Sequence, residues 1–159
     1  MHVDAKAAFQ KIEGASPDQR GALWAKLRPE LTAHEQIEER FVYDPAVKDV
    51  GDRAPMLSAW HRRHEQMVQQ ATSMMDEIGR LDSRDAQFLS MVEQLHQALA
   101  QHIEMEETEF WPLIRQAWGP ERLEQAGGKV EAAKTAATAG AGVSGALGAV
   151  SDAIKHVGD

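Results

Sequence analysis

The feature of this sequence that most limits its fold is a six-residue pattern, His-x-x-x-Glu-Glu, that occurs twice. The first copy runs from His34 to Glu39 and the second from His102 to Glu107, so Glu38 and Glu106 each stand four positions after the histidine. On an α-helix, residues four positions apart lie one turn apart on the same face, so each histidine and its glutamate point the same way. We therefore look for a fold that places two imidazole–carboxylate pairs on two helices.

Both pairs continue a stripe of apolar residues with helical spacing, which turns the pairs toward the core. The stripes are formed by Leu23, Leu27, Leu31, Phe88, Val92, Leu95 and Leu99. Burying a carboxylate without a partner costs several kcal/mol, so these positions need compensation. A single pair of this kind is usually a solvated surface pair. Two copies on core-facing stripes instead favour a bound cation.

The rest of the chain is also periodic, because Gly and Pro divide it into helix-length segments with little two-residue alternation. We expect an all-α fold, an up-and-down antiparallel four-helix bundle with a short or mobile C-terminal extension. Ser16 should cap the second helix with Pro17 first in it, Pro29 should kink or break that helix, and Asp82 or Ser83 should cap the fourth. The expected helices cover about 3–13, 17–43, 55–81 and 83–118, with a short one at 120–126.

A chain of 159 residues is long enough to bury one sizeable core. We assign residues 1–126 to the bundle and residues 127–159 to an Ala/Gly-rich tail, for which a fifth helix and a mobile segment are both open. The N-terminus has no apolar signal segment and no strongly apolar run of about 20 residues occurs. We therefore expect a cytoplasmic protein without a membrane partner.

Charge and composition narrow the function further. The net charge is -8 and no long run of Lys and Arg occurs, which makes nucleic acid a poor partner. Cys is absent, so disulfides, thiolate nucleophiles and thiolate metal sites are excluded. Any metal must be held by nitrogen and oxygen, which suits iron or manganese, and zinc accepts part of the same set.

The third expected helix offers two further imidazoles, His61 and His64, one turn apart. Either can ligate, and we prefer His64 because it continues more directly into the apolar stripe. The second glutamates of the repeats, Glu39 and Glu107, lie about 100° further round their helices. We expect these two at the flank or surface.

At this point the sequence resembles the hemerythrin-like, or HHE cation-binding, family over about residues 1–126. The resemblance implies a four-helix bundle around two iron ions (Fe²⁺/Fe³⁺) joined by an oxo or hydroxo bridge and by two carboxylates. The first-helix ligand of the family falls on His2, at the chain end, and His61 is a further candidate. The ligands that the resemblance implies most directly are His34, Glu38, His64, His102 and Glu106.

Our first functional hypothesis is a non-haem di-iron protein that binds O₂ or a related small ligand, NO or peroxide. Its role would be sensing, storage, or the handling of iron and oxidative stress. Ferritin-like di-iron proteins use Glu-x-x-His instead, which disfavours that class. The alternative is an enzyme that decomposes hydrogen peroxide or reduces NO, with catalytic residues unassigned. A third hypothesis is a regulatory protein whose tail responds to metal. The oligomeric state is left open.

Overall fold

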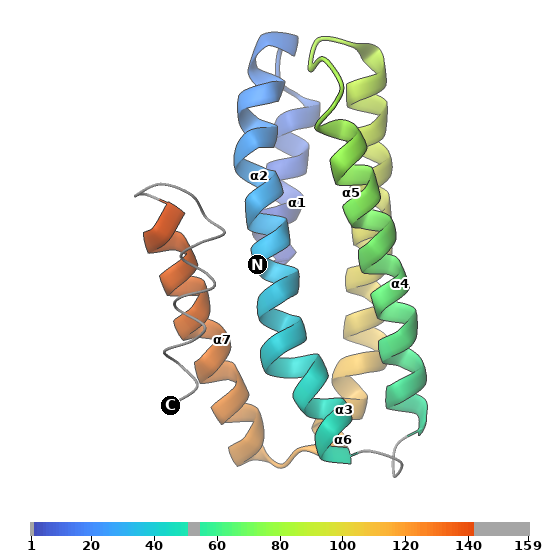
Figure 1. Ribbon diagram of the computed structural model, residues 1–159, viewed down its shortest axis with the longest axis vertical. Coiled ribbons are helices and arrows are strands. Elements are labelled where there is room, and N and C mark those ends of the chain that lie inside the picture. The colour runs from blue at the N-terminus through green and yellow to red at the C-terminus, as the bar shows by residue number, and fades with distance from the viewer. Residues whose placement is uncertain (1, 51–54, 142–159) are drawn as a thin grey trace. The chain divides into compact units, whose positions relative to one another are not determined.

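The chain is helical in a computed structural model that describes residues 2–50 and 55–141 (Figure 1). No strand occurs in these ranges, so the expected all-α fold, with four main helical segments and a C-terminal extension, is confirmed. No helix within them is long and apolar enough to cross a membrane. The elements are α1 (His2–Glu13), α2 (Pro17–Glu38), η1 (Glu39–Tyr43), α3 (Asp44–Val50), α4 (Pro55–Ile78), α5 (Ala86–Met105), η3 (Glu106–Phe110), α6 (Trp111–Ala117) and α7 (Pro120–Ala141).

The contacts divide the chain into two compact units. Unit 1 contains residues 1–31 and 62–110, and unit 2 contains residues 32–61 with the described residues from 111 onward. The division falls inside α2 and α4, so each of these helices contributes to both units. The first copy of the repeat therefore belongs to unit 2, and the second copy belongs to unit 1.

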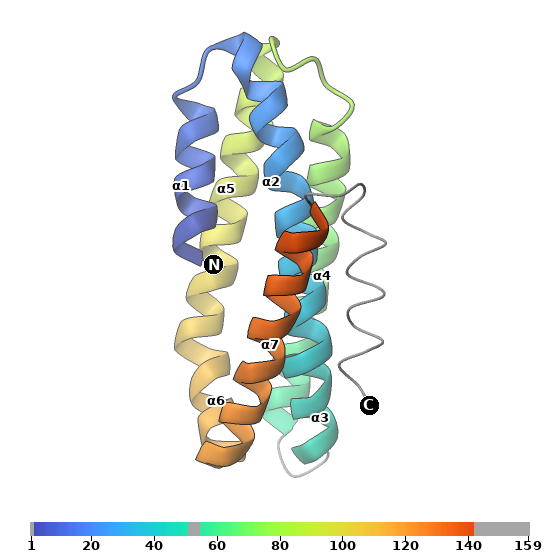
Figure 2. The same ribbon diagram turned by 90° about the vertical axis from the view of Figure 1, so that its left-hand side faces the viewer.

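Unit 1 is built on one apolar core to which four helices contribute. Figure 2 shows α1 lying alongside α5. Trp24 of α2 packs edge-on against Phe88 of α5, with ring centroids 6.4 Å apart. Short connections at 14–16 and 79–85 join consecutive helices, as an up-and-down arrangement requires. The buried core residues are Phe9, Ile12, Trp24, Leu27, Leu31, Ala71, Met75, Ile78, Phe88, Val92 and Leu95.

The start of α2 follows its predicted cap. The helix begins at Pro17, and the backbone N–H and hydroxyl of Ser16 both donate to Gln19 Oε1, at 3.4 and 3.0 Å. This is the return contact of a capping box. Of the kink or break expected at Pro29, the break does not occur: α2 continues through that residue to Glu38.

The start of α5 differs from our expectation that Asp82 or Ser83 would be the cap. The backbone N–H of Arg84 donates to Asp82 Oδ1 at 3.0 Å, so the aspartate side chain holds a turn instead of starting a helix. Asp85 then occupies the cap position with an extended backbone, φ -73° and ψ 144°, and α5 begins at Ala86.

Two π-helical segments follow the repeated motif. η1 joins α2 to α3, and η3 joins α5 to α6, so the helix expected to end at Tyr43 continues to Val50. Each segment ends two residues before a proline, Pro45 or Pro112. Proline lacks the N–H that would donate to the fourth residue back, and its ring crowds that carbonyl. The wider i→i+5 turn lets the helix pass the proline without ending.

Unit 2 contains η1, α3, α6 and α7. Figure 1 shows α3 and α6 next to each other, and α7 packs on η1. The contact is apolar: Ala133 of α7 is buried together with Ile37 and Phe41. Arg122, near the start of α7, donates from Nε to Asp49 Oδ2 at 3.0 Å. This helix is therefore fixed both at its start and along its inner face.

α7 is longer than the short helix that we expected to end at Ala126, because it runs through Gly127 and Gly128 to Ala141. Each glycine costs a helix about 1 kcal/mol relative to alanine. The alanine-rich segment that follows and the contact with η1 offset this cost. The rest of the tail, residues 142–159 with His156, lies outside the described residues.

Candidate metal centre

The buried polar side chains of the described residues are three members of the repeated motif and one histidine of α4. Among the residues whose side chains the structure describes, four polar or charged residues are buried: Glu38, His64, His102 and Glu106. All four are candidate ligands from the sequence. An ionised carboxylate is stable inside a protein only when a counter-charge and hydrogen bonds compensate for lost water. These positions are therefore arranged for partners of opposite charge.

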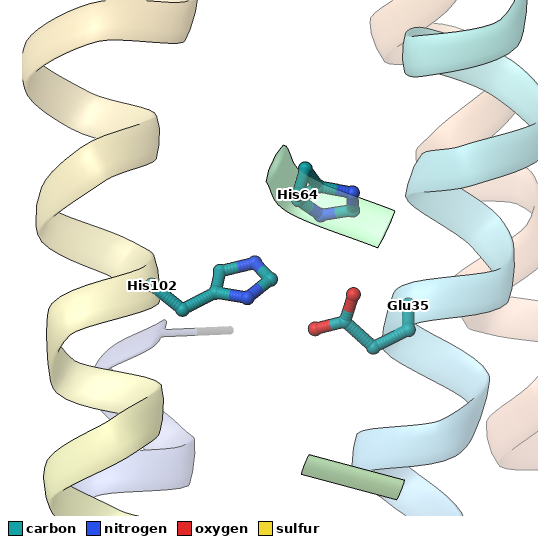
Figure 3. Close-up of side chains that lie close together, drawn as sticks. All are labelled: Glu35, His64 and His102. Carbon is teal, nitrogen blue, oxygen red and sulfur yellow. The ribbon is translucent and has the colours of Figure 1, made fainter. Parts of the chain in front are cut away.

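The second pair, His102 and Glu106, lies in unit 1 where α5 passes into η3. His102 Nε2 is 2.9 Å from Glu106 Oε1, and His64 Nε2 of α4 is 3.8 Å from the same oxygen. The rings of His64 and His102 meet nearly edge to face, with centroids 4.7 Å apart (Figure 3). The side chains of the second pair are 4% and 1% exposed. Two imidazoles thus converge on one buried carboxylate.

The first pair, His34 and Glu38, lies in unit 2 and has a different partner. His34 Nε2 is 3.2 Å from Glu38 Oε2, with side chains 13% and 9% exposed. The Tyr43 hydroxyl donates to the same oxygen at 3.1 Å. Tyr43 is fully buried and its ring lies 5.3 Å from that of Trp60. One imidazole and one phenol thus converge on this carboxylate.

The π segment η1 explains how Tyr43 reaches Glu38. In a regular α-helix the backbone bonds close over four residues, and a residue five positions on points away from the first. A π turn closes over five residues and brings that residue back to the same side. The second copy differs because η3 begins at Glu106 itself, and the residue five positions after Glu106 is Trp111, which has no hydroxyl. The repeat is therefore not symmetrical.

His61, a further candidate ligand, has a carboxylate partner from η1. Its Nε2 atom lies 2.7 Å from Glu39 Oε1. Burial raises the pKa of the Glu39 carboxyl above its usual value, although the contact with His61 acts in the opposite direction. The Asp44 carboxyl shares a hydrogen bond with Glu39 and adds to the increase. Glu39 is thus half-buried, as a flank position allows, and it contacts His61 and Asp44.

Three other residues complete the account of the predicted site. His2 lies in α1, but its side chain is outside those that the structure describes. Glu107 is exposed, as its helical position predicts. His96, which we did not select, lies 2.6 Å from Glu13 and stacks on Phe9.

Glu35 is the candidate donor that the sequence argument missed. It is half-buried on α2, can offer a carboxylate oxygen to a metal, and is labelled in Figure 3. The residue after His34 lies about 100° further round the helix, so the His-x-x-x-Glu spacing does not select it. Its position beside an apolar stripe was the signal that could have identified it.

The residues present fit a cation of the first transition row. The buried donors are imidazole nitrogens and carboxylate oxygens, and the chain has no Cys. Such donors bind iron, manganese and zinc, whereas soft copper(I) and iron–sulfur sites need sulfur. A cation beside each buried carboxylate would supply the positive charge that it requires.

Comparison with protein families supports this interpretation. The Hemerythrin HHE cation binding domain matches residues 2–114, a stretch that contains both pairs and His64. Comparisons with curated proteins and with solved structures found no match. The matched stretch covers most of the chain, and its buried histidines and glutamates are of the type that binds cations. The chain belongs to the hemerythrin HHE cation-binding family.

Proposed function

We propose that this protein is a non-haem di-iron protein that binds O₂, or a related small ligand such as NO or peroxide, at an iron pair held by the two pairs. The proposal rests on one observation: Glu38, His64, His102 and Glu106 are the buried polar side chains of the described residues. Membership in a cation-binding family supports the proposal that these side chains bind metal. Sensing, storage, and the handling of iron or oxidative stress are the roles that such a site fits.

The proposed ligands come from five elements: α1, α2, α4, α5 and η3. The second pair and His64 would hold one ion, and the first pair would hold the other, through imidazole nitrogens and carboxylate oxygens. His2 of α1 is the proposed first-helix ligand. Glu35 is added to this set because it is a half-buried carboxylate beside His34. His61, which contacts Glu39, stays a further candidate ligand.

The chain's own residues would shape the chemistry around the metal. Bound iron would supply an open coordination position and two accessible oxidation states. Tyr43 would hold Glu38 in one orientation through the hydroxyl contact, as the outer partners of metal ligands do. The burial of the second pair and His64 would keep bulk water from that half of the site. A small apolar ligand fits such an environment better than a charged substrate.

An enzymatic role is the alternative, and the buried hydroxyl of Tyr43 favours it. A phenol beside a ligand carboxylate can hold or pass a proton, which peroxide decomposition or NO reduction requires. A steady-state peroxide assay on iron-loaded protein separates the two functions. Oxygen evolution no faster than with free iron would remove the peroxide-decomposing alternative.

Anaerobic reconstitution with Fe²⁺, followed by metal analysis after desalting, tests the proposal. We expect about two iron ions per chain, as the two pairs predict. Stopped-flow mixing with O₂, NO or peroxide should then change the spectrum of wild-type protein. His102→Ala should lose both the metal and the response, while His96→Ala should keep both. Iron contents that are equal in these two variants would contradict the assignment.

A further inference from the structure

Tyr43 and Trp60 make an aromatic contact inside unit 2. Their ring centroids are 5.3 Å apart, and the rings are inclined at 59° to each other. Both residues belong to the segment 32–61, and both are buried, Tyr43 fully and Trp60 at 3% exposure. Aromatic rings at this separation touch each other. An electron passes readily between two oxidisable rings that touch, so this contact can conduct charge as well as pack.

The Tyr43 hydroxyl gives this contact a proton acceptor. It donates to Glu38 Oε2 at 3.1 Å, and the same oxygen lies 3.2 Å from His34 Nε2. A phenol that loses an electron becomes a strong acid, so it is oxidised most easily where a base already accepts its hydrogen bond. The Glu38 carboxylate is such a base. The contact therefore joins a proposed metal ligand to the ring of Trp60.

The other oxidisable side chains compete poorly with this pair. The sequence contains one Tyr, four Trp and no Cys, so no thiol can supply the electron. Trp24 lies in unit 1 against Phe88, which is not readily oxidised. The Arg122 guanidinium carbon is 4.6 Å from the ring centroid of Trp118, and a neighbouring cation opposes the removal of an electron. Of these three tryptophans, Trp60 is the one in contact with a tyrosine.

We propose that Tyr43 and Trp60 form a one-electron relay between the first pair and reductants in solution. This inference rests on the proposed function, because the oxidant is hydrogen peroxide at the iron pair. Reduction of one hydrogen peroxide to two water molecules takes two electrons and two protons. One electron comes from iron and the other from Tyr43, and solvent supplies both protons. The phenol O–H bond breaks in this step, and its proton passes to Glu38.

Trp60 then restores Tyr43. One electron passes from the indole to the tyrosyl radical, and the proton returns from Glu38 to the phenol oxygen. A small one-electron reductant of the ascorbate type reduces the oxidised indole and completes the cycle. Trp60 is followed in the chain by His61, whose side chain is partly exposed, so the reductant can approach from the surface without entering the buried site.

Laser flash photolysis of full-length protein with Zn²⁺ in place of iron tests the relay itself, because zinc does not change its oxidation state. An ultraviolet pulse removes an electron from tryptophan, and the absorption of the tryptophan radical is followed as it decays. Wild-type protein should show a tyrosyl signal that grows during this decay. The sequence contains one Tyr, so this signal belongs to Tyr43.

Three variants locate the path of the electron. Trp60→Phe should lose the growth of the tyrosyl signal, while Trp24→Phe, the same change at another buried tryptophan, should retain it. Tyr43→Phe should remove the fast part of the tryptophan decay, which keeps the test decisive if Trp60→Phe does not fold. Equal growth in wild type and Trp60→Phe, or an unchanged decay in Tyr43→Phe, would overturn the relay.

Iron-loaded protein tests the link to the first pair. After mixing with peroxide and rapid freezing, electron paramagnetic resonance should detect a tyrosyl radical in wild type and none in Tyr43→Phe. With ascorbate present, the signal should last several-fold longer in Trp60→Phe than in wild type. Equal lifetimes, or no radical in iron-loaded wild type, would contradict the relay.

The two experiments separate this inference from the proposed function. A wild-type chain that holds no iron but shows the growth of the tyrosyl signal after the laser pulse would refute the iron pair and keep the electron exchange between the two rings. A chain that holds about two iron ions but shows no such growth would refute the relay and keep the iron pair.

Discussion

The two copies of the motif share their spacing but have different surroundings. The second pair lies in unit 1 with its side chains 4% and 1% exposed, and a second imidazole, His64, contacts its carboxylate. The first pair lies in unit 2 with its side chains 13% and 9% exposed, and its carboxylate accepts a hydrogen bond from Tyr43. The motif therefore fixes the local pair, while the neighbouring elements fix water access and the third partner.

The difference suggests a division of labour between the pairs. A carboxylate shared by two imidazoles in a dry environment binds a cation firmly, because each donor is held in place and water competes poorly. A more open pair with a phenol partner exchanges ligands and protons more readily. We expect the second pair to hold metal more tightly and the first pair to respond to small ligands.

The largest expected effect is on iron content, when one imidazole is removed from either pair. His102→Ala should lower iron content below about one ion per chain, because we expect the second pair to bind iron more tightly than the first. His34→Ala should retain about one ion, held by the second pair and His64. Metal analysis after reconstitution measures both, with His96→Ala as the control. Equal losses, or a larger loss in His34→Ala, would contradict the ranking.

Substitutions of the aromatic residues that end η1 and η3 should have the next largest effects, on iron affinity and on stability respectively. Tyr43→Phe removes the donor to Glu38 and should weaken iron binding at the first pair about tenfold, as loss of an outer partner does. Phe110→Tyr adds a hydroxyl to a fully buried ring and should lower the free energy of unfolding by about 1–3 kcal/mol. Competition with a chelator and urea unfolding measure these effects. Unchanged affinity in Tyr43→Phe would remove its role in orienting Glu38.

The packing of α7 on η1 should stabilise unit 2, the unit that contains the first pair. Ala133→Asp places a carboxylate against Ile37 and Phe41 and should cost about 1–3 kcal/mol. Ala132→Asp, at an exposed position on the same helix, is the matched control. Urea unfolding gives the stability. If both variants unfold at the same urea concentration, the contact does not stabilise the protein.

The smallest expected effect concerns the glycines of α7. A Cβ at Gly128 would meet no atom within 4 Å, so Gly128→Ala adds helix propensity without a clash. We expect a stabilisation of about 1 kcal/mol. Thermal unfolding followed by circular dichroism measures it. A lower melting temperature would mean that α7 is not a regular helix at this position.

Much of the fold followed from the sequence because it depends on local rules. Leu27, Leu31, Val92 and Leu95 are buried where the helical period places them, and Ser16 caps α2 as expected. The prediction that Asp82 or Ser83 caps α5 was wrong, because the Asp82 side chain holds a turn of its own. These successes and this error both depend on residues within a few positions of one another.

The site was less predictable because it depends on helix phase and on contacts between distant residues. The π turn that brings Tyr43 to Glu38 has no counterpart in a regular 3.6-residue period. The contact between His61 and Glu39 joins residues from different helical segments. Periodicity identifies which residues face inward, but it does not determine which of them meet.

The central claim is that the two pairs together hold an iron pair, and the spectrum of the oxidised protein tests it most directly. After anaerobic loading with Fe²⁺, desalting and exposure to air, wild-type protein should carry about two iron ions and absorb in the near ultraviolet. Both signals should be lost in His102→Ala. Wild-type protein that holds less than about one iron ion and lacks this band after the same treatment would contradict the account.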